Sequence, residues 1–194
     1  MMKNALRWFL YAIIMPFVLP FSLLANMEKW LTRRSMFFDL GAHLVSLIPG
    51  VPGNYFRGAY YLLSLDYFHP TAVIGFGSFF SKRAACMRAG SGVGSYCVMG
   101  LVDIDEGARL ASRVSVISGL NQHGSAANIH YRSANLGSVR QLRIGKMTWV
   151  GEGAIIGASV GDNCIVGVGS VVLKDVPDQS LVMGNPGRLL PIPE

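Results

Sequence analysis

A six-residue period runs through the sequence from Phe68 onward and restricts the folds that the chain can adopt. Stepping by six from that residue reaches nine positions, and eight of them are apolar. The nine positions are Phe68, Ile74, Phe80, Cys86, Gly92, Val98, Ile104, Leu110 and Val116. Two residues before most of these steps the side chain is small, as at Ala72 and Ser78. Neither a helix nor an alternating strand has this period, whereas a short fixed repeat is typical of a solenoid.

This period predicts a triangular parallel β-helix. Each hexapeptide makes one flat side with its aliphatic residue pointing inward, the small residue allows the corner, and three sides complete a coil of 18 residues. The period stops after Val116 and resumes at Ile144, Val150 and Ile156, and then again at Val160 after a side two residues short. Residues 117–143 are therefore expected to leave the coil as an excursion loop. Long loops in compact domains are usually functional.

The composition divides the chain near residue 67. We expect a hydrophobic helical region that associates with membrane at residues 1–67, the β-helix at residues 68–176 and a C-terminal tail at residues 177–194. Residues 8–25 form an 18-residue run without a charge, which is just long enough to span a bilayer. Pro16 and Pro20 lie inside this run and argue against a straight span. A kinked, re-entrant or interfacial hairpin is therefore favoured, and a signal peptide competes with it.

Residues 36–65 continue apolar and helical in texture, interrupted by the breaker at residues 49–53. They are expected either to lie on a bilayer surface as two short amphipathic helices or to form a helical cap packed on the solenoid. Cations flank the apolar run on both sides, so the sequence indicates no clear orientation in a membrane.

Charge and cysteine content narrow the classes of partner. The formal net charge is +6, which favours anionic partners such as lipid head groups or phosphorylated cofactors. Nucleic-acid binding is not expected, because no recognition motif accompanies the charge. The three cysteines have no CxxC spacing and fit a reducing compartment. Cys86 and Cys164 are interpreted as small residues of the repeat, and no cysteine nucleophile is expected.

Three segments of the repeat resemble the end of the left-handed β-helix in the hexapeptide-repeat acyltransferases. They read IGKMTWVGEGAIIG, VGDNCIVGVGSVVLKDVP and MGNPGRLL. The segment IDEGARLASRVSVISGLNQHG resembles the stretch of galactoside, maltose and polysaccharide O-acetyltransferases that ends in the catalytic histidine. The hydrophobic leader with PGVPGNYFRGAYYLLSL resembles membrane-associated members that modify bacterial surface polysaccharides. The sequence departs from the commoner pattern at Gly92 and at the shortened side.

The resemblance implies an acetyl-coenzyme A dependent O-acetyltransferase that acts on a sugar hydroxyl of a surface polysaccharide or of its lipid-linked precursor. It implies a homotrimer, coenzyme A as a binding partner and no metal. The protein is expected at the cytoplasmic face of the inner membrane, in a peripheral or monotopic arrangement. The fold class expected is mainly β, with the helical region preceding the β-helix.

The candidate catalytic base is His123, at the mouth of the excursion loop, and His130 is its rival. Acyl transfer to an alcohol needs a base near the hydroxyl, and a neutral imidazole needs a partner that fixes its tautomer. Asp105 lies eighteen residues before His123, so an 18-residue coil would place it one coil below, and Asp103 is similarly placed beneath Asn121. Asn121, Gln122 and His130 are candidate contacts of the acceptor sugar.

Candidate coenzyme A contacts lie in the later coils. The resemblance assigns Lys174 and Arg188 to the phosphates of coenzyme A. Trp149 is a candidate wall of the channel for the pantetheine arm or the acceptor. Three glycines would let the cofactor approach the backbone closely, because they have no side chain. They are Gly151, Gly167 and Gly169.

The sequence leaves two other functions open. One is a non-catalytic membrane-associated scaffold whose solenoid binds a partner. The other is a zinc enzyme of the γ-class carbonic anhydrase type, which needs three histidines that converge across a subunit interface. Only His123 and His130 lie in a plausible region for such a site, so this alternative is disfavoured.

Overall fold

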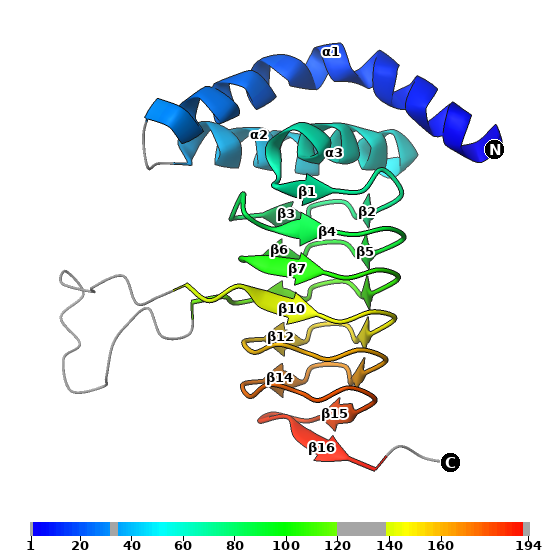
Figure 1. Cartoon of the computed structure of the whole chain (residues 1–194), viewed down its shortest axis with the longest axis vertical. Coiled ribbons are helices and arrows are strands. Elements are labelled where there is room, and N and C mark those ends of the chain that lie inside the picture. Colours follow the sequence, from blue (N-terminus) through cyan, green and yellow to red (C-terminus); the bar gives the residue numbers. More distant parts are fainter. Residues whose placement is uncertain (1, 32–34, 120–138, 192–194) are drawn as a thin grey trace.

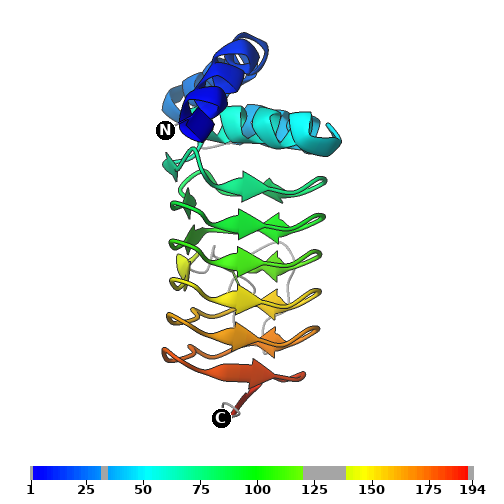
Figure 2. The same cartoon turned by 90° about the vertical axis from the view of Figure 1, so that its right-hand side faces the viewer.

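The computed structural model describes residues 2–31, 35–119 and 139–191, which form a helical layer on one end of a three-sided solenoid (Figure 1). The helices are α1 (Met2–Leu31), α2 (Met36–Ser46) and α3 (Gly50–Ser64). The solenoid begins at Tyr67, and Figure 2 shows its coils stacked in one column beneath the helices. The predicted fold class, a parallel β-helix preceded by an apolar helical region, is confirmed.

Three sheets form the sides of the solenoid. Sheet 1 holds β1 (Tyr67–Phe68), β4 (Cys86–Met87), β7 (Val102–Ile104) and β10 (Leu142–Ile144). Sheet 2 holds β2 (Val73–Ile74), β5 (Gly92–Val93), β8 (Arg109–Leu110), β11 (Trp149–Val150), β13 (Ile165–Val166), β15 (Leu181–Met183) and β16 (Arg188–Leu190). Sheet 3 holds β3 (Phe79–Phe80), β6 (Val98–Met99), β9 (Ser115–Val116), β12 (Ile155–Ile156) and β14 (Val171–Val172). Strand pairs are parallel except for β15 with β16.

The inward register differs from the prediction in the second coil. The buried residues there are Met87, Val93 and Met99, whereas Val98 is 41% exposed. The pairing gives the reason: Tyr67 aligns with Cys86, nineteen residues on, and Cys86 aligns with Asp103, only seventeen on. One extra residue in the corner after Phe80 shifts the period, and the coil after it is shorter. The inward positions predicted at Cys86, Gly92 and Val98 were therefore wrong by one residue.

The later coils confirm the shortened side. Ile144 pairs with Val160, and Val160 pairs with Val176, so each of these coils has sixteen residues. Val160 and Val176 are both buried and continue sheet 1 as isolated bridges, without forming full strands. The predicted tail also contains structure, because β15 continues sheet 2 and β16 turns back against it.

The helices α2 and α3 cover the open end of the first coil. The fully buried Arg57 side chain donates to the carbonyl oxygens of Ile48 and Ile74, both at 2.8 Å. The Phe80 N–H donates to the hydroxyl oxygen of Tyr61 at 3.0 Å. These bonds join the cap to the first turn of the solenoid, as expected for a packed helical cap.

The helix α1 crosses the outer side of this cap (Figures 1 and 2). The expected hairpin within residues 8–25 is not formed, because one helix continues through Pro16 and Pro20. Both prolines lie on the exposed side, where the carbonyl groups that lose a partner do not face the core. The helix bends outward there, as the arc in Figure 1 shows.

Candidate active site

The excursion loop leaves the solenoid between sheets 3 and 1. Its base is held by Ser118, whose hydroxyl oxygen accepts the Leu101 N–H at 2.9 Å and whose carbonyl oxygen accepts the Arg140 N–H at 3.2 Å. The candidate catalytic and acceptor residues Asn121, Gln122, His123 and His130 lie outside the described residues. Their predicted roles therefore stay predictions.

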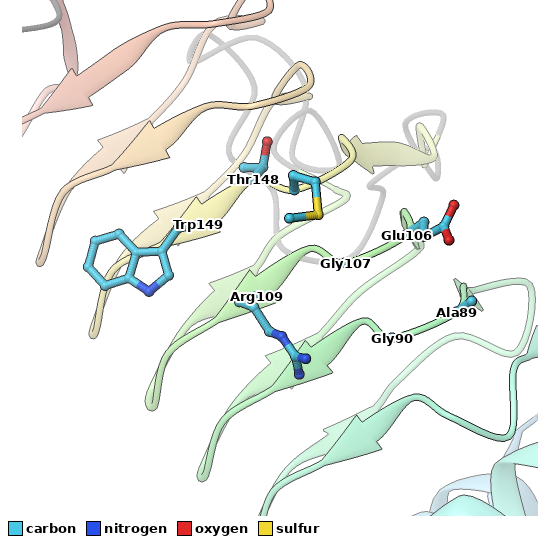
Figure 3. A pocket seen from close by; sticks show the side chains of 8 residues that line it. Ala89, Gly90, Glu106, Gly107, Arg109, Thr148 and Trp149 are labelled. Atoms are coloured by element: carbon cyan, nitrogen blue, oxygen red, sulfur yellow. The ribbon is translucent and has the colours of Figure 1, made fainter. Parts of the chain in front are cut away.

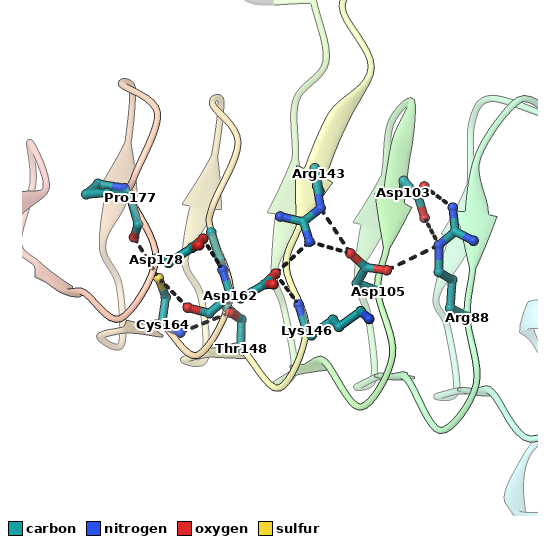
Figure 4. A network of polar contacts seen from close by, with 11 residues as sticks. Arg88, Asp103, Asp105, Arg143, Lys146, Thr148, Asp162, Cys164, Pro177 and Asp178 are labelled. Carbon is teal, nitrogen blue, oxygen red and sulfur yellow. Dashed lines mark hydrogen bonds and ion pairs between the residues drawn. The ribbon is translucent and has the colours of Figure 1, made fainter.

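Asp105 lies beside the strand that follows this loop. Its carboxylate forms ion pairs with Arg88 at 3.2 Å and with Arg143 at 2.7 Å, and its side chain is only 10% exposed (Figure 4). Strand pairing aligns Ile104 with Ile144, so Gly145 occupies in the next coil the position that Asp105 has in its own coil. The next strand of sheet 1 after β7 is thus β10 and not the segment that contains His123, so the 18-residue spacing by itself does not place His123 over Asp105; their proximity stays a prediction.

The ion pairs of Asp105 belong to a network along the corner between sheets 1 and 2 (Figure 4). Arg88 also donates two hydrogen bonds to the Asp103 carboxylate, from Nε to Oδ1 at 3.1 Å and from Nη2 to Oδ2 at 2.6 Å. Arg143 reaches Asp162 in the following coil at 2.6 Å. The Lys146 backbone N–H and the Arg143 guanidinium hold the pKa of Asp162 below its usual value. The network joins coils on both sides of the loop into one charged edge.

Two shallow recesses flank this corner. The first, of about 410 Å³, is lined by Tyr67, Arg88, Ala89, Asp103, Asp105, Glu106, Arg143 and Lys146. The second, of about 520 Å³, is lined by Ala89, Gly90, Glu106, Gly107, Arg109, Met147, Thr148 and Trp149 (Figure 3). Trp149 is 43% exposed and pairs across the sheet with Arg109. The indole thus lines an open recess, and its predicted place on a channel for pantetheine or the acceptor stays a prediction.

The arginines of this corner were not among the predicted site residues. Arg88 and Asp105 are seventeen residues apart, one coil in this part of the chain, which a search at that spacing would have detected. The predicted loop, residues 117–143, ended too late, because β10 begins at Leu142 and contains Arg143. Since Arg143 comes after the interruption of the repeat, its pairing with Asp105 leaves no signal in a fixed period.

Lys174 and Arg188 lie together in a third cavity of about 470 Å³ near the end of the solenoid. Its lining residues are Val172, Leu173, Lys174, Asp175, Val176, Val182, Pro186, Gly187, Arg188 and Leu189. The antiparallel strand β16 returns along β15 and so brings Arg188 back to the last coils. Two cations in one partly apolar cavity suit an anionic ligand that also has an apolar segment.

The three glycines predicted to contact cofactor have structural reasons of their own. A Cβ on Gly151 would lie 2.6 Å from the Val168 nitrogen, and one on Gly167 would lie 2.9 Å from Met183 Cγ. Gly169 has a φ of +65°. Close stacking of coils and a left-handed turn therefore explain these glycines without a ligand.

The described cysteines and histidines offer no competing centre. Burial raises the pKa of the thiols of Cys97 and Cys164, which disfavours a thiolate nucleophile. His43 packs edge-on against Phe79 and His69 bonds to Thr71. Across residues 2–31, 35–119 and 139–191, no three His, Cys, Asp or Glu side chains are grouped as metal ligands.

Comparisons with known proteins point to acyltransferases. No family model matches the chain. A Staphylococcus aureus (strain COL) protein named “Putative acetyltransferase” is 35% identical over 65 residues, which cover 32% of this chain and 33% of that protein. Serine acetyltransferase 4 of Arabidopsis thaliana is 34% identical over 97 residues, 46% of this chain and 23% of that protein. The chain thus spans about a third or less of the length of these relatives.

Solved structures share the fold. A maltose O-acetyltransferase of Clostridium difficile 630 has a TM-score of 0.55 at 19% identity, and the match covers 81% of this chain and 85% of the acetyltransferase chain. A variant of AntD, an N-acyltransferase from Bacillus cereus in complex with dTDP-4-amino-4,6-dideoxyglucose and coenzyme A, has a TM-score of 0.52 at 17% identity, covering 68% and 78%. The repeat, the solenoid and these similarities agree with the motifs, and the chain has the fold of the hexapeptide-repeat acyltransferases.

Proposed function

We propose that the protein is an acetyl-coenzyme A dependent O-acetyltransferase whose acceptor is a sugar hydroxyl of a bacterial surface polysaccharide or its lipid-linked precursor. The observation that carries the proposal is the cavity that contains Lys174 and Arg188 at the end of a solenoid similar to those of acetyltransferases. The phosphates of coenzyme A bind these two cations, and its apolar segment lies against the aliphatic lining.

In this proposal His123 is the general base. It takes the proton from the acceptor hydroxyl as the hydroxyl oxygen bonds to the thioester carbonyl carbon. The tetrahedral intermediate collapses with loss of the carbon–sulfur bond, and the imidazolium returns the proton to the departing thiolate. The products are the acetyl ester and free coenzyme A. A backbone N–H stabilises the oxyanion.

A carboxylate orients His123, and Asp105 or Asp103 is assigned this role. Asp105 accepts a hydrogen bond from Arg143 and forms an ion pair with Arg88, but a carboxylate has about four acceptor positions, so it can also accept a hydrogen bond from an imidazole. Asn121, Gln122 and His130 contact the acceptor in this proposal. Trp149 lines the channel, and three subunits assemble around flat sides of the solenoid so that each site lies between two of them.

The proposal locates the protein at the cytoplasmic face of the inner membrane. It is supported by α1, the one helix in the described ranges that is long and apolar enough to cross a bilayer, over Ala5–Leu31. A signal sequence near the N-terminus would pass the same test of length and composition.

Transfer is tested by incubating the purified chain with acetyl-coenzyme A and membrane glycolipids and measuring both coenzyme A release and glycan acetylation. We expect His123→Ala to lower turnover by about 10²- to 10⁴-fold while coenzyme A binding is kept. His130→Ala serves as the matched variant and should lose much less. Normal turnover of His123→Ala at saturating substrate would remove His123 from this role, and failure to bind coenzyme A would favour the scaffold alternative.

A further inference from the structure

The helix α1 has its polar side chains on the wrong side for a helix that faces water. Between Trp8 and Glu28 the polar side chains of Tyr11, Ser22 and Glu28 are buried against the protein, and the Asn26 amide bonds inward to the Leu63 carbonyl oxygen at 3.0 Å. The outer side carries large exposed apolar residues: Leu6, Trp8, Phe9, Ile13, Phe17, Leu19, Phe21, Leu23, Leu24, Met27, Trp30 and Leu31. Such a side suits an environment that offers no hydrogen bonds.

Both ends of α1 are fastened to the rest of the molecule. Near the start, the Tyr11 hydroxyl donates to the Pro70 carbonyl oxygen at 3.2 Å. Near the end, the Glu28 carboxylate accepts the N–H groups of Met36 at 2.7 Å and Phe37 at 2.9 Å, and so caps α2. A helix that crossed a bilayer would move one of these ends to the far interface and break its bonds. The helix therefore cannot span a membrane while it keeps this packing.

From these two observations we infer that α1 lies in the plane of a lipid bilayer surface with its outer side in the lipid, so that the solenoid stands end-on on the membrane. The inference rests on the membrane location in the proposed function and specifies how the protein meets the bilayer. It replaces a transmembrane span, which length and composition alone would allow.

Charges at the ends of α1 favour anionic lipid as the occupant of this side. No charged residue lies between Arg7 and Glu28 in sequence, and Glu28 is buried. Lys29, at the end of the helix, is exposed and also pairs with Asp66 at 3.3 Å, and Arg33 and Arg34 follow it in the sequence. Trp8 and Trp30 are exposed at the two ends, and tryptophan prefers the level of the head groups. An interface with another protein usually contains hydrogen bonds, and the outer side of α1 offers few groups that could form them.

The end-on arrangement gives the two substrates different routes. The long axis of the solenoid runs away from α1 in both views (Figures 1 and 2). With about 4.8 Å between strands, the loop base near β9 lies about 10 Å beyond β3, and the cavity with Lys174 lies about 19 Å beyond it. The base of the loop at Ser118 is thus nearer the lipid, where a lipid-linked acceptor enters, and coenzyme A enters from the far, aqueous end.

Depth-resolved quenching tests the inference on the full-length protein. Three variants each keep one tryptophan on α1: Trp30→Phe keeps Trp8, Trp8→Phe keeps Trp30, and Trp8→Phe/Trp30→Phe/Phe17→Trp puts one at position 17. Each is mixed with phosphatidylethanolamine and phosphatidylglycerol vesicles that contain lipids brominated near the head group or near the chain end. Trp149 on the solenoid gives an internal signal that lipid should not quench.

We expect all three probes to be quenched to a similar extent by the shallow bromines. Strongest quenching of the position-17 probe by deep bromines, with shallow quenching at Trp8 and Trp30, would show a spanning helix and overturn the inference. Absence of quenching together with self-association in lipid-free buffer would overturn it in favour of a second copy of this chain.

A pair of exposed positions provides a matched control. Phe17 on α1 is 66% exposed and Val168 on the solenoid is 68% exposed. We expect Phe17→Asp to weaken vesicle binding by at least about tenfold and Val168→Asp to leave it unchanged. Equal binding by both variants would overturn the inference. Coenzyme A binding is measured in the same samples. Coenzyme A binding that is kept while vesicle binding is lost would separate the lipid contact from the proposed enzyme function.

Discussion

Arg143 and Asp105 form an ion pair at 2.7 Å that joins the coil before the excursion loop to the coil after it. Asp105 follows β7, before the excursion loop, and Arg143 lies in β10, directly after it. The pair is thus a clamp that aligns the two coils on either side of the loop. It also places a carboxylate and a guanidinium on the charged edge between sheets 1 and 2.

The clamp predicts a measurable loss of stability when it is removed. Arg143→Gln should lower the free energy of unfolding in urea by about 1 kcal/mol, because half-exposed charged pairs are partly screened by solvent. Arg113→Gln is the matched control, since Arg113 forms an ion pair with Glu152 that is more exposed and also joins two coils. Equal effects of the two substitutions would show that Arg143 is no more than a surface charge.

The repeat predicted the solenoid and its shortened side, but not the register of every coil. Cys86 and Met87 are adjacent and both can fill a core position, so a strict period of six chose the wrong one. The extra residue sits in the corner after Phe80, and a corner has no apolar signal that would reveal it. One wrong corner then displaced Val93 and Met99 as well.

The helical region and the anion cavity show two further limits. The apolar run predicted a helix that prefers lipid, but average hydropathy does not tell on which side Tyr11 and Glu28 lie, and that detail separates an in-plane helix from a span. Lys174 and Arg188 were assigned by resemblance. Their closeness depends on β16 turning back antiparallel, a reversal that no parallel repeat predicts.

The cations of the terminal cavity should control the affinity for acetyl-coenzyme A. Lys174→Ala and Arg188→Ala are each expected to raise KM for acetyl-coenzyme A by about tenfold with little change in kcat, because hydrogen bonds to charged groups contribute about 1.5–3 kcal/mol. Lys82→Ala, which removes an exposed lysine of an early coil, is the control. If one of these residues contacts the 3′-phosphate, its substitution should not raise KM further when the donor is acetyl-dephospho-coenzyme A, which lacks that phosphate. A KM for acetyl-coenzyme A that is unchanged in both variants would place coenzyme A elsewhere.

The charged edge should make the later coils sensitive to acid. The pKa of Asp162 is lowered by the Lys146 N–H and by Arg143, and that of Asp175 is lowered by Arg140 and the Ser159 N–H. A lowered folded pKa contributes stability above the unfolded pKa of about 3.9, and this is lost as the pH falls through the folded value. Unfolding in urea at several pH values should show Asp162→Asn to be less stable than the parent protein at pH 7 and similar to it well below pH 3.9. Parallel pH curves would rule out this linkage.

Arg57 should be the residue on which the joint between cap and solenoid depends most. Its buried guanidinium donates to the carbonyl oxygens of Ile48 and Ile74 and to the Asn54 side chain at 2.7 Å, and none of its hydrogen-bond partners in the described part of the chain is a carboxylate. The bonds to the last carbonyl oxygens of α2 also place a positive charge at the negative end of that helix. Arg57→Met should leave several buried carbonyl groups unpaired and cost about 3 kcal/mol or more.

The control for this substitution is Arg109→Met, which removes an exposed arginine from the middle of sheet 2. We expect Arg57→Met to lower the urea midpoint and to speed hydrogen exchange at the Ile74 and Phe80 amides, which lie under the cap, while amides of β13 exchange as before. Arg57→Lys keeps the charge but cannot reach the same set of acceptors, so it should recover only part of the loss. Full stability of Arg57→Lys would mean that charge alone holds the joint, and full stability of Arg57→Met would mean that the apolar contacts of α2 and α3 suffice.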